Sequence, residues 1–262
     1  VSGGARYDHH NRFGGEWTLG ANGSVNLSGD WRLRASYGEG FKTPTLFQLL
    51  SDFGNATLSP ERSRSFDAGI ERGDRNGVTH FALTVFRRDS RDLIDFVGCG
   101  SLGVCATRPF GTYDNVRRAR AEGFEIEGNV RPAEGVQLRA AYSYAKATNR
   151  DTGNDLARRP RYALSLSGDW TLDPGRVFAT TLGADVRLVG DSFDDPGNST
   201  RIDGHALLTV RASRPLLLLD VASQRTLDLF GRVENVGGAD YQTVAGYGTP
   251  GRSAHVGVRL RL

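Results

Sequence analysis

Several features that would define a common class of protein are missing from this sequence. No apolar run approaches the roughly 18 residues of a membrane-spanning helix, because the nearest candidate, residues 215–219, ends at Asp220. There is no block of five or six like charges, and the net charge is only +3. This pattern excludes a basic tail and gives no indication of nucleic acid as a partner.

The sequence contains no methionine, and its start lacks a charged region followed by an apolar one. No signal peptide is therefore visible, and we expect a processed product or an excised piece.

A catalytic or metal-binding set is also missing. There is no Gly-x-Ser-x-Gly motif, and the carboxylates Glu125 and Glu127 fit one lumen-facing row better than a general acid and base. The five histidines have no zinc-ligand spacing. They are His9, His10, His80, His205 and His255. We therefore expect neither an enzyme nor a metal site.

The only two cysteines are Cys99 and Cys105, with two glycines between them. In an oxidising compartment they would close a small loop, which predicts a disulfide. Two free thiols are the alternative, and a metal site would need more ligands than this segment holds.

What the sequence does contain is alternation with a period of two. Residues 31–37 place Trp, Leu, Ala and Tyr on one face and Arg, Arg and Ser on the other. Similar segments recur along the chain and predict about 12 strands, with no amphipathic helix longer than Thr45 to Leu50. The segment 215–225 is oddly apolar for the connection that we expect there.

Connections between the expected strands alternate between short and long. Short turns lie near residues 28, 75, 133 and 174, and the long loops are 39–62, 97–113, 148–160, 191–201 and 237–252. All long loops then fall at one end, as in outer-membrane barrels. Aromatic residues near strand ends fit two interfacial girdles. They are Trp17, Trp31, Tyr37, Tyr142, Tyr144, Tyr162 and Trp170. The alternative is a soluble β-sandwich with these aromatics in its core.

Several motifs resemble the barrels of TonB-dependent outer-membrane receptors. They are Gly40-Phe-Lys-Thr-Pro-Thr-Leu46, Gly54-Asn55, Leu58-Ser-Pro-Glu-Arg-Ser63, and the segments 89–95, 115–125 and 235–252. The resemblance covers nearly the whole chain. It implies an all-β, antiparallel transmembrane β-barrel over residues 1–262, corresponding to the last half of a barrel of about 22 strands. The family's plug domain and TonB-contacting segment are not in the sequence.

The resemblance also implies a function. Members of this family take up a large, scarce ligand across the outer membrane with energy delivered by TonB. The segment Gly246 to Arg252 is most similar to the vitamin B12 (cobalamin) receptor branch, so we expect a corrinoid. A ferric siderophore, haem or another metal chelate is the nearest alternative. The family's calcium ligands would lie mainly upstream, so no cofactor is expected within this chain.

Two other classes stay open. A self-contained 12-stranded passive pore or adhesin would close on itself by pairing residues 1–7 with residues 254–262. An outer-membrane enzyme ranks below it, because no catalytic motif occurs.

Candidate ligand contacts come from two sources. By resemblance, Arg158 and Tyr247 match positions that contact cobalamin. Loop aromaticity alone adds Phe41, Phe53, Phe110 and Tyr113. For each of these residues, packing within its loop is the alternative role.

Overall fold

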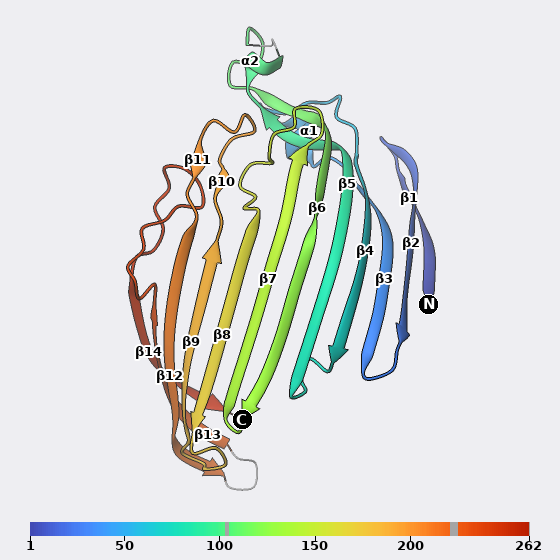
Figure 1. Ribbon diagram of the computed structural model, residues 1–262. Helices are drawn as coiled ribbons and strands as arrows, with labels where there is room; N and C mark the ends of the chain where they lie inside the picture. Colours follow the sequence, from blue (N-terminus) through green and yellow to red (C-terminus); the bar gives the residue numbers. More distant parts are fainter. Residues whose placement is uncertain (103–104, 221–224, 262) are drawn as a thin grey trace.

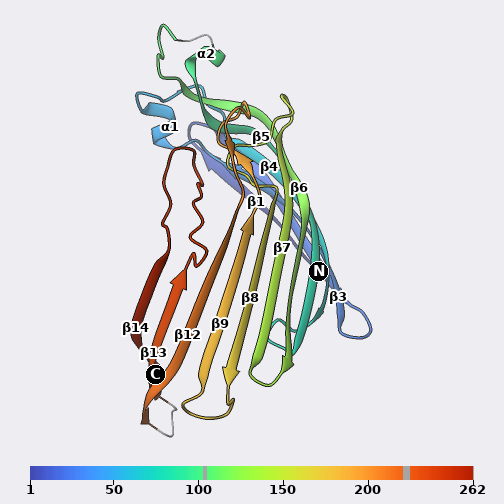
Figure 2. The ribbon, with the colours of Figure 1, turned by 60° about the vertical axis from the view of Figure 1, so that its left-hand side comes forward.

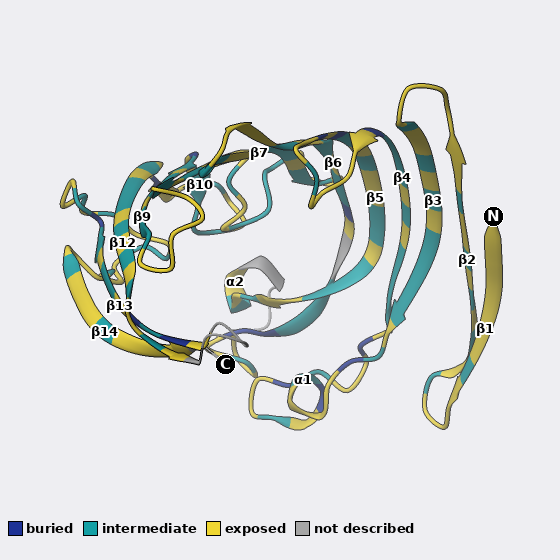
Figure 3. Ribbon diagram, turned by 90° about the horizontal axis from the view of Figure 1, so that it is seen from below, coloured by how far each residue is buried: buried dark blue, intermediate teal, exposed yellow. Residues whose placement is uncertain are grey.

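The computed structural model describes residues 1–102, 105–220 and 225–261. These residues form a 12-stranded antiparallel sheet in which every strand lies beside its neighbours in the chain. Seen along its axis, the sheet is a curved wall that is open on one side (Figure 3). The all-β antiparallel prediction is confirmed.

The sheet contains β1 (Ser2–His10), β2 (Gly14–Asn26), β3 (Trp31–Lys42), β4 (Glu61–Gly73), β5 (Thr79–Val97), β6 (Thr112–Ala133), β7 (Val136–Asn149), β8 (Tyr162–Leu172), β9 (Thr180–Val189), β12 (His205–Asp220), β13 (Arg225–Glu234) and β14 (Ser253–Arg261). A separate ribbon pairs β10 (Ser192–Phe193) with β11 (Arg201–Ile202). Two short helices are present, α1 (Leu46–Leu50) and α2 (Cys99–Leu102). No helix in the described part of the chain is long and apolar enough to cross a membrane.

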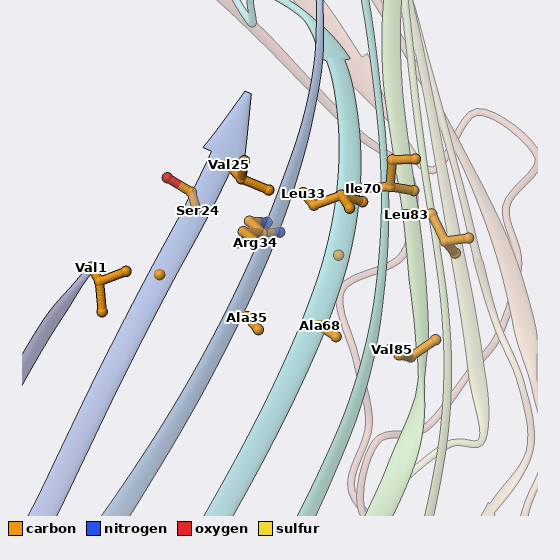
Figure 4. A pocket seen from close by; sticks show the side chains of 12 residues that line it. Val1, Ser24, Val25, Leu33, Arg34, Ala35, Ala68, Ile70, Leu83 and Val85 are labelled. Atoms are coloured by element: carbon orange, nitrogen blue, oxygen red, sulfur yellow. The ribbon is translucent and has the colours of Figure 1, made fainter. Parts of the chain in front are cut away.

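The predicted alternation places apolar side chains on one face of the wall. Leu33 lies opposite Ile70, and Ile70 lies opposite Leu83 on the next strand. Figure 4 shows these side chains side by side across β3, β4 and β5, with Val25 of β2 beside them. Paired residues share a face, so this apolar row continues across the sheet.

This apolar face is not packed against other protein. Leu33, Trp170 and Val258 have exposed fractions of 40%, 55% and 63%. Apart from Pro44, only five apolar side chains are buried within the described residues. They are Leu49, Leu58, Ala82, Ala119 and Ile202. A soluble sandwich would bury its aromatics in a core, whereas an outer-membrane barrel turns them toward lipid.

The opposite, inward face is held by ion pairs. Arg211 of β12 contacts Asp169 of β8, with Nη2 2.6 Å from the carboxylate, and also contacts Asp185 of β9. Glu71, only 6% exposed, pairs with Arg32 of the neighbouring strand. These charged side chains inside the wall are therefore neutralised locally.

The two ends of the wall differ as expected. Short turns lie at one end, and α1, α2 and the β10–β11 ribbon lie at the other (Figures 1 and 2). The turn between β4 and β5 is closed by the Gly77 amide, which donates to the Asp74 carbonyl over 2.8 Å. The long-loop end therefore gathers most of the irregular structure.

Two expectations about connections were wrong. The apolar segment 215–225 was expected as a connection, but β12 continues to Asp220 and pairs with β13, with register shifts after Pro215 and Leu218. Residues 221–224 lie outside the described residues. The loop expected at 39–62 is also shorter, because β3 extends to Lys42 and β4 begins at Glu61.

The pairing expected for a self-contained barrel does not occur in the described part of the chain. β1 and β14 are the two edges of the sheet, and neither pairs with the other. Leu262, the last residue of the expected pairing segment, lies outside the described residues.

Candidate ligand site in the long loops

Five aromatic rings gather at the long-loop end. The Phe53 ring lies 5.8 Å from Phe96 and 6.5 Å from Phe110, and Phe96 lies 5.7 Å from Tyr113, centroid to centroid. Phe47 of α1 lies 6.1 Å from Tyr113. All four contacts are edge-to-face, the geometry that the ring quadrupole favours. We call Phe47, Phe53, Phe96, Phe110 and Tyr113 the aromatic cluster.

The aromatic cluster brings together three of the residues that the sequence singled out, namely Phe53, Phe110 and Tyr113. Phe110 has 77% of its surface exposed, so the cluster is open to a ligand. Phe41 lies elsewhere, in β3 directly opposite Arg62. Phe47 and Phe96 were missed. Phe47 could have been found by the same signal, because it is an aromatic residue of the expected helix Thr45 to Leu50 within the same long loop as Phe53.

The loop that carries Phe53 is held in place by short-range hydrogen bonds. Thr45 and Gln48 cap α1 reciprocally, each side chain reaching the other's backbone amide. The loop then turns at Gly54, where a Cβ atom would lie 2.7 Å from the Leu49 carbonyl carbon. Only glycine fits there, so the loop returns tightly beneath α1.

Contacts with β6 then fix the loop against the wall. The Tyr113 amide donates to the Phe53 carbonyl over 3.0 Å. Asn115 donates to the carbonyls of Ser59 and Asp92 and accepts from the Ser59 amide over 2.8 Å. Asn115 of β6 therefore ties the loop that carries Phe53 to β5 and helps to position the aromatic cluster.

Arg158 links its own loop to two others. Its Nε donates to Asp194 over 2.7 Å, and its backbone amide donates to Phe193 over 2.6 Å. Asp194 also accepts from the Ala245 amide over 3.3 Å. Arg158 has a φ of 57°, a left-handed conformation that non-glycine residues adopt uncommonly. We call the contact of Arg158 with Asp194 the loop clasp.

Charges near the loop clasp reinforce it. The hydrogen bond from Arg158 lowers the pKa of Asp194, so the carboxylate stays ionised. The same bond raises the pKa of Arg158, and Asp95 and Tyr247 add to this rise. Tyr247 is 71% exposed. The structure thus places Arg158 and Tyr247 in one neighbourhood, while their role in binding stays a prediction.

A second carboxylate shapes the loop that supplies Asp194. Asp195 accepts hydrogen bonds from the backbone amides of Thr200 and Ser199, which lower its pKa. Asn198 donates to the Asp155 carbonyl over 2.9 Å and so links this loop to the one before β8. Sequence reasoning missed Asp194 because a loop rich in Asp and Asn gives no signal for which carboxylate faces an arginine.

The predicted disulfide between Cys99 and Cys105 is confirmed. It closes the tip of the connection between β5 and β6, which also carries Phe110. The described residues contain no group of three or more His, Cys, Asp or Glu side chains that could hold a metal ion.

An antiparallel wall with an exposed apolar face, an ion-paired inner face and long loops at one end defines an outer-membrane β-barrel. The family "TonB dependent receptor-like, beta-barrel" matches residues 1–236. The chain therefore belongs to this family of outer-membrane transport receptors.

Solved structures share the fold. The ferric enterobactin receptor of Pseudomonas aeruginosa superposes with a TM-score of 0.77 at 22% identity, covering 98% of this chain and 41% of that receptor. The pyoverdine-bound receptor FpvA of P. aeruginosa gives 0.71 at 18% identity, with 93% and 32% covered. The ferric preacinetobactin receptor of Acinetobacter baumannii gives 0.72 at 16% identity, with 93% and 36% covered. The chain thus spans about two fifths or less of these receptors.

Proposed function

We propose that this chain is part of the barrel of an outer-membrane receptor that binds a ferric siderophore and imports it with energy from TonB. The observation that carries the proposal is that the aromatic cluster and the loop clasp both lie in loops at the long-loop end of a TonB-dependent receptor wall. The solved structures with this fold include receptors for ferric enterobactin, pyoverdine and preacinetobactin. They favour a ferric chelate over the corrinoid that Gly246 to Arg252 suggested.

The chemistry of the site agrees with such a ligand. A ferric catecholate chelate presents aromatic rings and a net negative charge. Exposed rings such as Phe110 supply large apolar contact area, and an arginine supplies charge-assisted hydrogen bonds to catecholate oxygens. Arg158 would exchange its bond to Asp194 for bonds to the ligand, which couples binding to the arrangement of three loops.

The complete receptor would carry parts outside this chain. We propose that β1 and β14 pair with the other strands of a closed barrel, because free sheet edges do not persist within a bilayer. The plug and the TonB-contacting segment would likewise lie outside residues 1–262.

The test is equilibrium binding to the complete receptor in detergent, with a radiolabelled ferric catecholate chelate and labelled cyanocobalamin compared in parallel. We expect tight binding of the chelate only. Phe110→Ala and Arg158→Gln should each weaken it by about tenfold, the effect of losing one good contact of about 1.4 kcal/mol. Phe178→Ala, in the turn between β8 and β9 at the opposite end, is the matched control.

Either of two results would contradict this proposal. Tight cyanocobalamin binding without chelate binding would return the ligand to the corrinoid class. Chelate binding that neither variant weakens would remove the aromatic cluster and the loop clasp from the site.

A further inference from the structure

Four arginines lie side by side near the long-loop end of the wall. Arg62 of β4 is directly opposite Arg91 of β5, and Arg91 is directly opposite Arg118 of β6. The Arg150 amide, next along the row, donates to the Arg118 carbonyl over 2.7 Å. Like charges directly opposite each other destabilise a sheet, so this arrangement needs compensation. We call these four residues the arginine row.

The protein compensates only half of the arginine row. Arg62 pairs with Glu16 over 2.7 Å, and Arg118 pairs with Asp151 over 2.9 Å. Within the described residues, the side chains of Arg91 and Arg150 have neither a hydrogen bond nor an ion pair. Two guanidinium groups are therefore available to bind an anion from outside the chain.

A shallow groove of about 320 Å³ runs along the arginine row. A second row of charges, on the same strands, forms its other side. In that row Arg64 pairs with Glu39 over 3.2 Å, and Arg120 pairs with Asp89 over 2.6 Å. Among these residues, six arginines have four carboxylate partners, and one of these carboxylates, Asp89, is shared with Arg87 at the end of the groove. The groove therefore carries an excess of positive charge.

The groove lies on the outward face of the wall. Every second residue of a strand points to the same face, so residues 62, 64, 66, 68 and 70 of β4 share one face. This face carries the exposed ring of Phe66 and the apolar side chains of Ala68 and Ile70. Arg62 lies four residues from Phe66, about 13 Å along the strand at about 3.3 Å per residue. The arginines thus sit just beyond the apolar band, at the depth of lipid head groups.

The other end of the same face has no comparable cluster in the described part of the chain. There Arg72 is stacked over the Trp31 ring at 5.5 Å, and the neighbouring strand contributes Phe81 opposite Arg72. The excess of positive charge is therefore specific to the long-loop end, which faces the exterior in barrels of this kind.

We propose that the arginine row binds the phosphate group of a lipid in the outer leaflet of the outer membrane. The lipid's acyl chains would lie along the exposed apolar face of β3 to β5, and its phosphate would lie over the row, where Arg91 and Arg150 can reach it from the two sides of Arg118. Guanidinium groups are well suited to phosphate because they donate two parallel hydrogen bonds. The lipid site is separate from the aromatic cluster, so this proposal does not depend on which ligand the receptor imports.

The experiment measures binding of lipid A, a bisphosphorylated glycolipid, to the complete receptor in a neutral detergent by native mass spectrometry. Monophosphoryl lipid A, zwitterionic phosphatidylethanolamine and the soluble polyphosphate inositol hexakisphosphate are measured in parallel. We expect lipid A to bind tightest. Arg91→Gln with Arg150→Gln should weaken its binding by about 30-fold, since each of the two arginines near a membrane contributes about 1 kcal/mol.

Two further variants separate the site from general effects of charge. Arg131→Gln with Arg176→Gln removes the same charge at the short-turn end and should leave lipid A binding unchanged. Arg91→Lys with Arg150→Lys keeps the charge and should restore most of the affinity. The fold of each variant is checked by circular dichroism.

Three results would overturn the proposal. Lipid A could bind no tighter than phosphatidylethanolamine, which would remove the need for a phosphate site. The two double Gln variants could weaken lipid A binding equally, which would reduce the effect to net charge. Inositol hexakisphosphate could compete fully for the same arginines with equal affinity, which would show a soluble anion site.

Discussion

The wall and the long loops of this protein are held together by different forces. In the wall, continuous backbone ladders join neighbours such as β5 and β6, whose pairing extends from Thr79 with Val130 to Val97 with Thr112. In the loops, single side chains such as Asn115 and Arg158 make the decisive contacts. The difference teaches that stability and recognition are separable here. Changes to the wall should alter unfolding, and changes to the loops should alter binding.

The largest effect on stability is expected from a charge on the outward face. Leu83→Arg places a guanidinium in the apolar row of Figure 4, where its cost toward the middle of a bilayer is about 2–4 kcal/mol. The free energy of unfolding, measured by urea titration of the complete receptor in lipid vesicles, should fall by that amount.

The matched control puts the same side chain on the inward face. Ser143 lies opposite Glu125 on β6, so Ser143→Arg gains an acidic neighbour. Its cost should stay below about 1 kcal/mol, as for an exposed ion pair. Equal losses for the two variants would contradict the assignment of the faces.

The next effect concerns the ion pairs of the inward face. Arg211→Met leaves Asp169 and Asp185 as neighbours without the cation between them, and we expect a loss of about 2 kcal/mol. Arg139→Met is the comparison, because Arg139 makes only one contact with Asp169, at 3.5 Å. Its loss should be about 0.5 kcal/mol. Urea titration measures both, and a larger loss for Arg139→Met would show that Arg211 is not the central cation.

The wall could be predicted from the sequence, because alternation with a period of two indicates both that a segment is a strand and which of its residues share a face. Leu33 lies opposite Ile70 in the apolar row, whereas the guanidinium of Arg34 donates to Thr84 and lies near Glu71 on the inward face, as their spacing requires. It went wrong at 215–225, where Leu216, Leu217 and Leu219 are exposed on a strand that continues past Pro215. Because this apolar stretch does not alternate, its sequence pattern does not indicate a strand.

The candidate site could be predicted only in part. Loop aromaticity pointed to Phe53, Phe110 and Tyr113, whose rings belong to one cluster, but it also pointed to Phe41, which lies elsewhere in β3. The partner of Arg158 was not predictable, because Asp194 is 36 residues away and comes close only through the packing of two loops. Pairings of this kind depend on tertiary structure, which local pattern does not encode.

The disulfide tests the independence of the loops. Cys99→Ser with Cys105→Ser removes a cross-link of short span, worth about 2 kcal/mol to the loop that it closes. The wall does not depend on this loop, so the urea midpoint should barely move, while limited proteolysis between β5 and β6 should become faster. Loss of folding in the double variant would show that the loop and the wall form one cooperative unit.

The smallest effect is the response of the loop clasp to pH. Because Arg158 lowers the pKa of Asp194 in the folded protein, the clasp is present above the pKa of an unfolded aspartate and is lost as the pH falls through the lowered value. The carboxyl carbon of Asp194, followed by NMR, should therefore titrate below the ordinary aspartate range. Arg158→Gln should return its midpoint to that range, whereas Arg159→Gln, one residue along the same loop, should leave it low. An ordinary midpoint in the unaltered protein would mean that the clasp does not hold Asp194 in solution, and the loops would then be arranged by other contacts, such as those of Asn198 and Asp195.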